Sequence, residues 1–162
     1  MEWNFKKYTQ LKLIYKFSPL LKLKYNILSD RVTYQDYDRA YKLNPDGNLT
    51  RYRMGLTHLL QLHHSLNERS FYTLSFTHFN KSYFHETYSE EDQGLLIHSD
   101  FGVTEPYSFK TGGTNNNLFS RQTKTTTAKF DLTSQYTHRH LMKFGFEFRQ
   151  HDLQYENINL QA

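Results

Sequence analysis

The segment HLMKFGFEFRQHDLQYE, residues 140–156, alternates between apolar and polar side chains with a period of two. In an extended chain, successive side chains point to opposite faces. One face of this segment therefore carries a row of large apolar residues, which are Met142, Phe144, Phe146 and Phe148. The other face carries charged or small residues, which include Lys143, Gly145, Glu147 and Arg149. The pattern predicts a β-strand between an apolar and a hydrated environment.

The same period recurs along most of the chain. Apolar residues share one face in five further runs, at 10–17, 20–28, 52–64, 71–79 and 125–136. The 162 residues include thirteen Tyr, thirteen Phe and one Trp, a 17% aromatic content that favours strands. No segment of useful length has a helical period. We therefore predict an all-β chain, an antiparallel up-and-down meander of about six strands.

Short and long connections alternate between these strands. Short turns are expected near 18–19, 65–70 and 137–140, and long loops near 38–51 and 86–124. In an antiparallel meander this alternation places every long loop at the same end. Outer-membrane barrels have such an arrangement, with short periplasmic turns and long extracellular loops. Two extended runs, 20–37 and 71–88, also exceed the roughly 9–11 residues with which a strand crosses a bilayer.

Hydropathy is consistent with a membrane barrel. The mean hydropathy of −0.80 excludes helical spans, but barrel strands expose only alternate residues to lipid. A turn at 18–19 places Leu23 opposite Tyr15, and a turn near 138–139 places Phe146 opposite Leu132. Apolar rows then meet apolar rows. We predict that the lipid-facing residues are Leu11, Leu13, Leu21, Leu23, Leu60, Leu62, Leu74, Phe76, Phe130, Leu132, Phe144, Phe146 and Phe148.

Two soluble alternatives compete with this interpretation. One is a sheet with a single buried face. The other is a β-sheet module that binds nucleic acid or another polyanion, which the net charge of +4 and the pI of about 9.1 would suit. A nucleic-acid surface mixes basic and aromatic side chains on one exposed face, whereas the runs above place them on opposite faces. We therefore expect no nucleic-acid partner.

Three segments resemble the barrels of TonB-dependent outer-membrane receptors: LKLKYNILSDRVTYQDYDRAYKLNPDGNLTRYR, SFYTLSFTHFNKSY and LMKFGFEFRQHDLQYE. They are most similar to large receptors in which the barrel follows a plug and an N-terminal carboxypeptidase-like domain. The resemblance extends over about residues 10–156. It implies an outer-membrane location and TonB-powered uptake of a bulky nutrient, such as an iron chelate, cobalamin, a glycan or a peptide.

The resemblance also implies missing parts. Such receptors are similar to 22-stranded plugged barrels, so residues 1–162 would form an interior piece of the wall without a plug domain. The opening MEWNFKKYTQ is not a signal peptide, and NINLQA lacks the terminal aromatic residue of a last barrel strand. The expected partners are outer-membrane lipid, the remainder of the barrel and plug, the TonB complex through the plug, and the nutrient. The piece alone is expected to be inactive.

Few residues suggest a chemical site. A turn centred near Glu68 places His58 opposite His78, which makes them weak metal candidates, although a neutral pair near the membrane interface is the preferred interpretation. NPDGN, residues 44–48, resembles part of a calcium loop, but a turn is preferred. We expect no enzymatic activity and no cofactor, because no catalytic triad or paired carboxylates stand out. The long loop is the expected place of ligand contact, through Phe101, Tyr107, Phe109 and Phe119.

Overall fold

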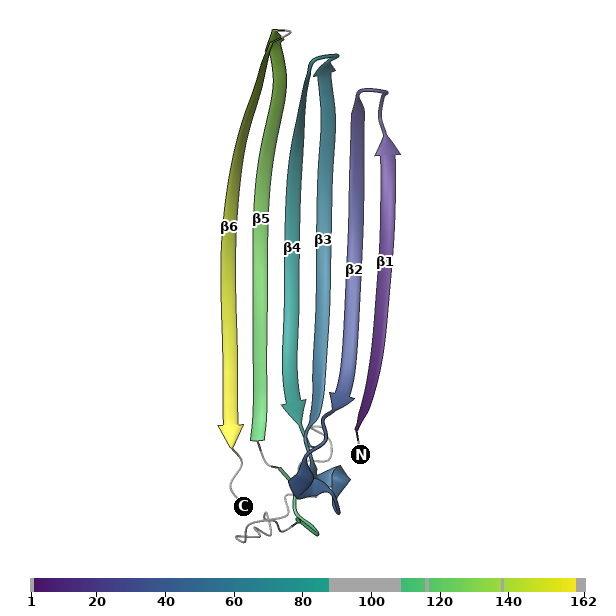
Figure 1. Ribbon diagram of the computed structural model, residues 1–162, viewed down its shortest axis with the longest axis vertical. Coiled ribbons are helices and arrows are strands. Elements are labelled where there is room, and N and C mark those ends of the chain that lie inside the picture. The colour runs from purple at the N-terminus through teal and green to yellow at the C-terminus, as the bar shows by residue number, and fades with distance from the viewer. Residues whose placement is uncertain (1, 88–108, 116, 138, 160–162) are drawn as a thin grey trace.

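The computed structural model describes residues 2–87, 109–115, 117–137 and 139–159. These residues form one six-stranded antiparallel sheet in which each strand pairs with the next one along the chain (Figure 1). The strands are β1 (Trp3–Lys16), β2 (Leu21–Gln35), β3 (Thr50–Asn67), β4 (Ser70–Glu86), β5 (Asn117–Thr137) and β6 (His140–Asn159). The predicted all-β meander is confirmed. The sheet is open, with β1 and β6 at its edges.

The connections gather at opposite ends of the sheet. In Figure 1 the short turns after β1, β3 and β5 lie at one end, and the long connections after β2 and β4 lie at the other. We call these the turn end and the loop end. The first long connection contains two 3-10 turns, η1 (Arg39–Tyr41) and η2 (Pro45–Gly47). The NPDGN segment is therefore a turn, and Asn44 donates from its amide to the Gly113 carbonyl across the loop end, 2.7 Å away.

A β-bulge lies next to two of the short turns. In the β3–β4 hairpin, Asn67 pairs with Ser70, but the next pair is Ser65 with Phe71, which leaves Leu66 as the extra residue. In the β5–β6 hairpin, Thr137 pairs with His140 and Gln135 with Leu141, so Tyr136 is extra. Each bulge shifts the pairing by one residue. Because a one-residue shift moves every side chain to the other face, the bulges bring apolar rows opposite apolar rows.

The register of the last hairpin differs from the one predicted from the sequence. We expected Phe146 opposite Leu132 and Phe148 opposite Phe130, whereas Phe146 pairs with Phe130 and Phe148 pairs with Ala128. The observed partners are displaced by two residues along β5. The position of the turn accounts for one of these residues and the bulge for the other. Because a shift of two residues keeps each side chain on the same face, the predicted faces are unchanged. In the first hairpin, Leu23 pairs with Tyr15 as predicted.

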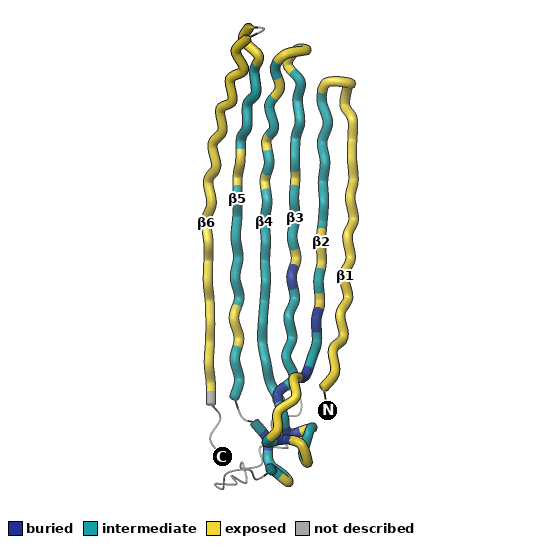
Figure 2. The backbone as a smooth tube through the Cα atoms, in the orientation of Figure 1, coloured by how far each residue is buried: buried dark blue, intermediate teal, exposed yellow. Residues whose placement is uncertain are grey.

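The buried residues lie at the loop end and not at the middle of the sheet (Figure 2). Among the described residues, the buried apolar side chains are Val32, Tyr41 and Leu49. Gln35 is also buried, and its amide donates to the Pro45 carbonyl at 2.9 Å. The long connections thus pack on the end of the sheet, while both faces of its central part remain uncovered by other described segments. No helix in the described part of the chain is long and apolar enough to cross a membrane.

Candidate functional site

One face of the sheet carries continuous rows of apolar side chains across all six strands, and we call it the apolar face. Adjacent pairs in the register define one row as Tyr15, Leu23, Leu62, Leu74, Phe130 and Phe146. The next row is Leu13, Tyr25, Leu60, Phe76, Ala128 and Phe148. All thirteen residues predicted to face lipid lie on this face. The alternation of each strand and the register between strands therefore agree over the whole sheet.

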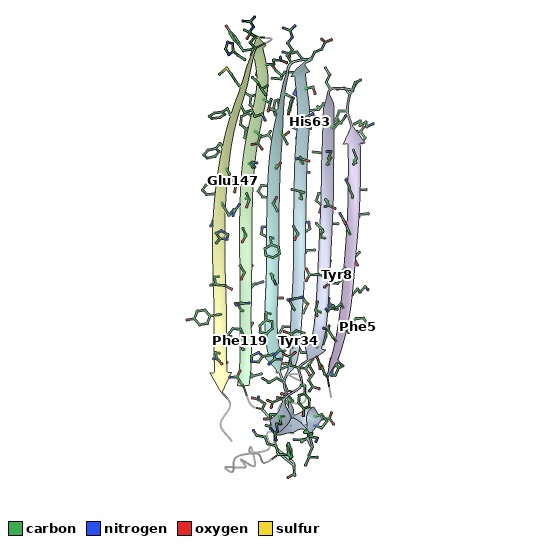
Figure 3. All side chains as sticks on the ribbon, viewed as in Figure 1. Phe5, Tyr8, Tyr34, His63, Phe119 and Glu147 are labelled. Carbon is green, nitrogen blue, oxygen red and sulfur yellow. The ribbon has the colours of Figure 1, made fainter. Side chains whose placement is uncertain are left out.

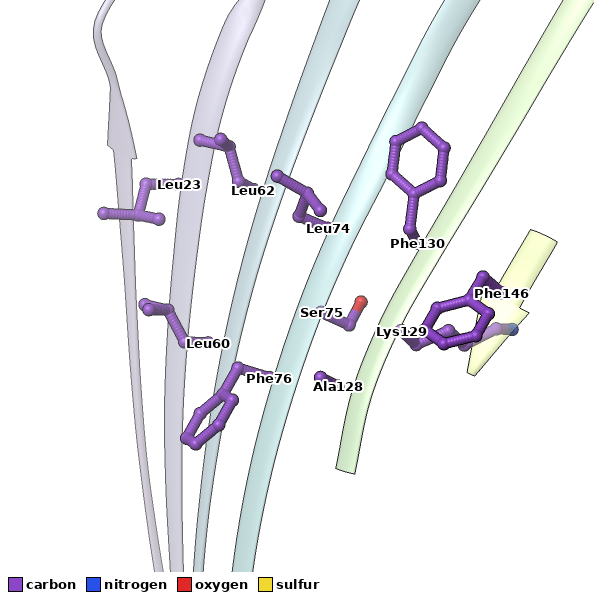
Figure 4. Close-up of a pocket in the computed structure, with 10 residues that line it drawn as sticks. All are labelled: Leu23, Leu60, Leu62, Leu74, Ser75, Phe76, Ala128, Lys129, Phe130 and Phe146. Carbon is purple, nitrogen blue, oxygen red and sulfur yellow. The ribbon is translucent and has the colours of Figure 1, made fainter. Parts of the chain in front are cut away.

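These apolar side chains are accessible despite their size. Phe146 on the edge strand is 62% exposed, and Phe76 on the central strand β4 is 46% exposed. Between them lies a hollow of about 510 Å³, which ten residues line (Figure 4). Its apolar lining consists of Leu23, Leu60, Leu62, Leu74, Phe76, Ala128, Phe130 and Phe146. The surface suits an apolar environment that fills gaps between side chains.

The opposite face is polar, and we call it the polar face. At the level of the apolar rows it carries the small side chains Thr73, Ser75 and Thr77 on β4, whereas β3 carries His63, Gln61 and Leu59. Charged side chains appear toward the edge, where Lys129 pairs with Glu147. Glu147 also accepts a bond from Arg149 at 2.5 Å.

Arginine and aromatic side chains meet on the polar face near the loop end. We call this group the arginine–aromatic cluster. Two neighbouring rows of the register supply its members, on β2, β3, β4 and β5. Figure 3 shows two of them, Tyr34 and Phe119, toward the loop end of the sheet. The cluster comprises Tyr34, Arg51, Arg53, Tyr83, His85, Phe119 and Arg121.

Ring contacts connect the cluster across the strands. The Phe119 ring lies 5.9 Å from the Tyr83 ring and 5.4 Å from the His85 ring, between centroids. The Tyr83 hydroxyl lies 3.2 Å from Nδ1 of His85, and Nε2 of His85 lies 2.6 Å from Oδ1 of Asn117. The tautomer with a proton on Nε2 satisfies both bonds, because Nδ1 then accepts from the tyrosine hydroxyl. The aromatic part is thus held by directed hydrogen bonds.

The three arginines of the cluster differ in their partners. Arg51 forms an ion pair with Asp36, and its guanidinium carbon lies 5.9 Å from the Tyr34 ring centroid. The Arg121 guanidinium carbon lies at the same distance from the Tyr83 ring centroid. Nε of Arg53 is buried and has no hydrogen-bond partner within the described structure. Because a buried donor without an acceptor is costly, Arg53 would gain from a rearrangement that brings this donor to an acceptor.

Burial raises the pKa of the Tyr83 hydroxyl above its ordinary value, and Tyr34 raises it further, whereas Arg51 opposes the rise. Tyr83 lies beyond the apolar rows, on the loop-end part of β4. Its hydroxyl therefore remains protonated near neutral pH and can donate to His85 or to a bound anion.

The cluster was not predicted from the sequence. On the second strand the regular alternation was described only to residue 28, although an extended run to residue 37 was predicted, and β2 ends at Gln35. On the fifth strand the predicted run began at residue 125, whereas β5 begins at Asn117. The predicted separation of basic and aromatic residues holds on the central rows but fails at the loop end. The alternation of Arg51, Tyr52 and Arg53 was the available signal, because it places both arginines on one face.

The structure pairs His58 directly with His78 on the apolar face. Nδ1 of His58 lies 2.7 Å from the Tyr25 hydroxyl, and Nδ1 of His78 lies 3.1 Å from Oγ1 of Thr126. Both imidazoles thus have protein partners at the border between the apolar rows and the polar loop-end rows. No group of three or more potential metal ligands occurs among the described residues.

The four aromatic residues predicted for ligand contact have different outcomes. Phe101 and Tyr107 lie outside the described residues. Phe109 lies beneath two cations, with Nζ of Lys42 5.4 Å and the Arg39 guanidinium carbon 5.8 Å from its ring centroid. Phe119 was expected in the long loop but lies in β5, because the strand begins two residues earlier. It belongs to the arginine–aromatic cluster.

No family model matches the chain, and no curated protein matches it at a significant level.

Proposed function

We propose that this sheet is a wall segment of a transmembrane β-barrel, with the apolar face against lipid and the polar face toward a hydrated interior. The observation that carries the proposal is the set of apolar rows that continue across all six strands on one face. In water, a face of this kind needs a second layer. Among the described segments none covers it.

The apolar surface has a defined height along the strands. Three rows, from the row of Leu21 to the row of Leu13, are apolar over most of the strands. The next row begins with Leu11 and Ile27 but is polar from β3 onward, at His58, His78, Thr126 and Gln150. The three apolar rows occupy about 20 Å of strand at about 6.7 Å for every two residues. A strand tilt of about 40° reduces this length to a height of about 15 Å, which fits within the roughly 25 Å apolar band of outer-membrane barrels.

Within this proposal, the barrel is that of a TonB-dependent outer-membrane receptor. The three segments that resemble such receptors support this class, and so does the gathering of long connections at one end. The long connections would then face the cell exterior, and the strands beyond β1 and β6 would complete the wall. Such a receptor would take up a bulky nutrient, with a plug and the TonB complex as partners. The sheet itself contributes wall and ligand-facing surface.

Fluorescence quenching tests which face meets lipid. The chain contains no cysteine, so a single cysteine can carry a polarity-sensitive dye without further changes. The full chain is reconstituted into phosphatidylcholine vesicles as Leu62→Cys or as Gln61→Cys, two adjacent positions on opposite faces of β3. We expect brominated acyl chains to quench the dye at 62 and aqueous iodide to quench the dye at 61.

Equal access of iodide to both positions in a folded sheet would contradict the proposal. A chain that forms a compact monomer in water, with the dye at 62 shielded by protein, would also contradict it and would favour a soluble fold. Circular dichroism in each sample verifies that strand content is retained, so the quenching pattern reports the environment of a formed sheet.

A further inference from the structure

We propose that the arginine–aromatic cluster binds a small aromatic carboxylate. This inference deepens the proposed function, on which its relevance to uptake rests, while the binding itself depends only on the cluster. The cluster lies on the polar face near the long connections. In a barrel wall this is the part of the interior that an incoming ligand meets first.

The positive charge of the cluster favours an anionic ligand. Of its three arginines, Arg51 is paired with Asp36. Neither Arg53 nor Arg121 forms an ion pair with a carboxylate within the part of the chain that the structure describes. At adjacent positions of the polar face, Lys6 and Lys81 contribute two more positive charges and Asp30 contributes one negative charge. The cluster therefore keeps an excess of positive charge.

The geometry favours a carboxylate between two guanidinium groups. Arg53, Tyr83 and Arg121 are successive members of one row, on β3, β4 and β5. Because adjacent strands lie about 4.8 Å apart, the two arginine backbones are about 10 Å apart and flank the tyrosine. Guanidinium groups bind carboxylates through paired N–H donors. The unpartnered Nε of Arg53 supplies one such donor.

The rings next to these arginines favour an aromatic body on the ligand. Phe119 and Tyr83 lie side by side with their centroids 5.9 Å apart, in neighbouring rows of the polar face. Aromatic rings gain from stacked or edge-to-face contact with another ring. A ligand with a ring and a carboxylate can satisfy both parts of the cluster at once.

The size of the cluster favours a small ligand over a polymer. Its arginines occupy two neighbouring rows on β3 and β5, and the carboxylates of Asp30 and Asp36 border them. A polyanion would need a longer basic track and would meet these carboxylates. The positively charged area is thus about as large as a ligand with one carboxylate and one ring.

Ligand-observed fluorine NMR tests the proposal. The full chain in dodecylphosphocholine micelles is titrated with 4-fluorobenzoate and with its neutral analogue 4-fluorobenzamide. We expect the carboxylate to bind at least tenfold more tightly than the amide. Arg53→Gln and Arg121→Gln are each expected to lower the affinity for 4-fluorobenzoate at least fivefold. Inorganic phosphate is expected to compete at least tenfold more weakly than unlabelled benzoate, since it has no ring.

Arg149→Gln is the matched control, because Arg149 also lies on the polar face but is paired with Glu147 and lies outside the cluster. It is expected to leave the affinity unchanged. Arg121 is exposed, so its substitution tests the site even where Arg53→Gln disturbs the fold, and circular dichroism identifies such a disturbance.

Several results would overturn the proposal. These are an absence of 4-fluorobenzoate binding, equal affinity for the amide, equal competition by phosphate, or no loss in the Arg121 variant. Tighter binding of an oligothymidylate or of an acidic peptide, lost in the same variants, would assign the cluster to a macromolecule instead. Benzoate binding without lipid access at Leu62 would leave this inference standing and refute the membrane wall.

Discussion

Phe146 and Glu147 are neighbours in the chain, yet their side chains lie on faces of opposite polarity. Phe146 extends the apolar row through its pair with Phe130, whereas Glu147 lies on the polar face opposite Lys129 and beside Arg149. At the scale of single residues, the sheet therefore has two faces of different chemistry. The effect of a substitution on stability should depend more on the face that carries the residue than on how much the volume of the side chain changes.

Phe146→Arg is expected to destabilise the sheet in a bilayer by about 2–4 kcal/mol, the cost of a lipid-facing arginine near the bilayer midplane. Urea titration of the chain in phosphatidylcholine vesicles, followed by circular dichroism, measures the change. Glu147→Gln is the control and is expected to cost less than about 1 kcal/mol, because it weakens only exposed ion pairs. Similar effects at the two positions would contradict the assignment of the faces.

At the scale of elements, two of the three hairpins combine a two-residue turn with a bulge. Arg139 lies in the turn between β5 and β6, and the bulge at Tyr136 lies on β5 just before this turn. A two-residue turn alone would pair Phe146 with Asp131. The bulge restores the match of apolar with apolar residues. The hairpin between β3 and β4 uses the same device with Leu66, so both bulges lie at the turn end of the sheet.

Cysteine pairs test the register of the last hairpin. Phe130→Cys with Phe146→Cys is expected to form a disulfide rapidly in air, since directly opposed residues have Cα atoms about 4.5–5.5 Å apart. Leu132→Cys with Phe146→Cys, the pair expected from the sequence, should be at least tenfold slower, because diagonal neighbours lie about 7–8 Å apart. Gel mobility after timed alkylation measures both rates. A faster reaction of the Leu132 pair would contradict the register between β5 and β6 and favour the register expected from the sequence.

At the scale of the whole molecule, the sheet is open and its edges are long. β1 and β6 each present one side without a partner strand among the described residues. Such edges are templates for pairing with another chain, and in lipid an unpaired edge is costlier still. The sheet is expected to acquire neighbours on both sides, from a barrel or from other copies.

Self-association of the chain should therefore occur through the edges. Single cysteines at Gln10 on β1 and at Ser75 on β4, which both lie on the polar face, report which strands meet between copies. At equal concentration in micelles, Gln10→Cys is expected to form disulfide-linked dimers at least fivefold faster than Ser75→Cys. Non-reducing electrophoresis measures the rates. Equal rates would indicate association through the faces.

The sequence predicted the strands and their faces because a period of two is a local property. The faces of Phe146 and Phe148 were correct even though their partners were wrong, since an error of two residues preserves the side on which they lie. The bulges at Leu66 and Tyr136 could not be predicted, because no local residue pattern marks an extra residue. They follow from the need to match two strands.

The arginine–aromatic cluster is a property of four strands together. Arg53 and Arg121 are far apart in the sequence, and only the register brings them to either side of Tyr83. The strand ends that hold the cluster also lie outside the most regular parts of the alternation. Local patterns therefore predict the faces more readily than the contacts.

The six strands are also three hairpins, since β1, β3 and β5 all run toward the turn end and β2, β4 and β6 return from it. Duplication or deletion of one whole hairpin keeps the direction of every remaining strand. Gain or loss of a single strand would reverse all the strands after it and exchange their long connections for short turns. If the sheet belongs to a barrel wall, as proposed, such a wall can therefore change circumference during evolution in steps of two strands, without inverting the strands already present.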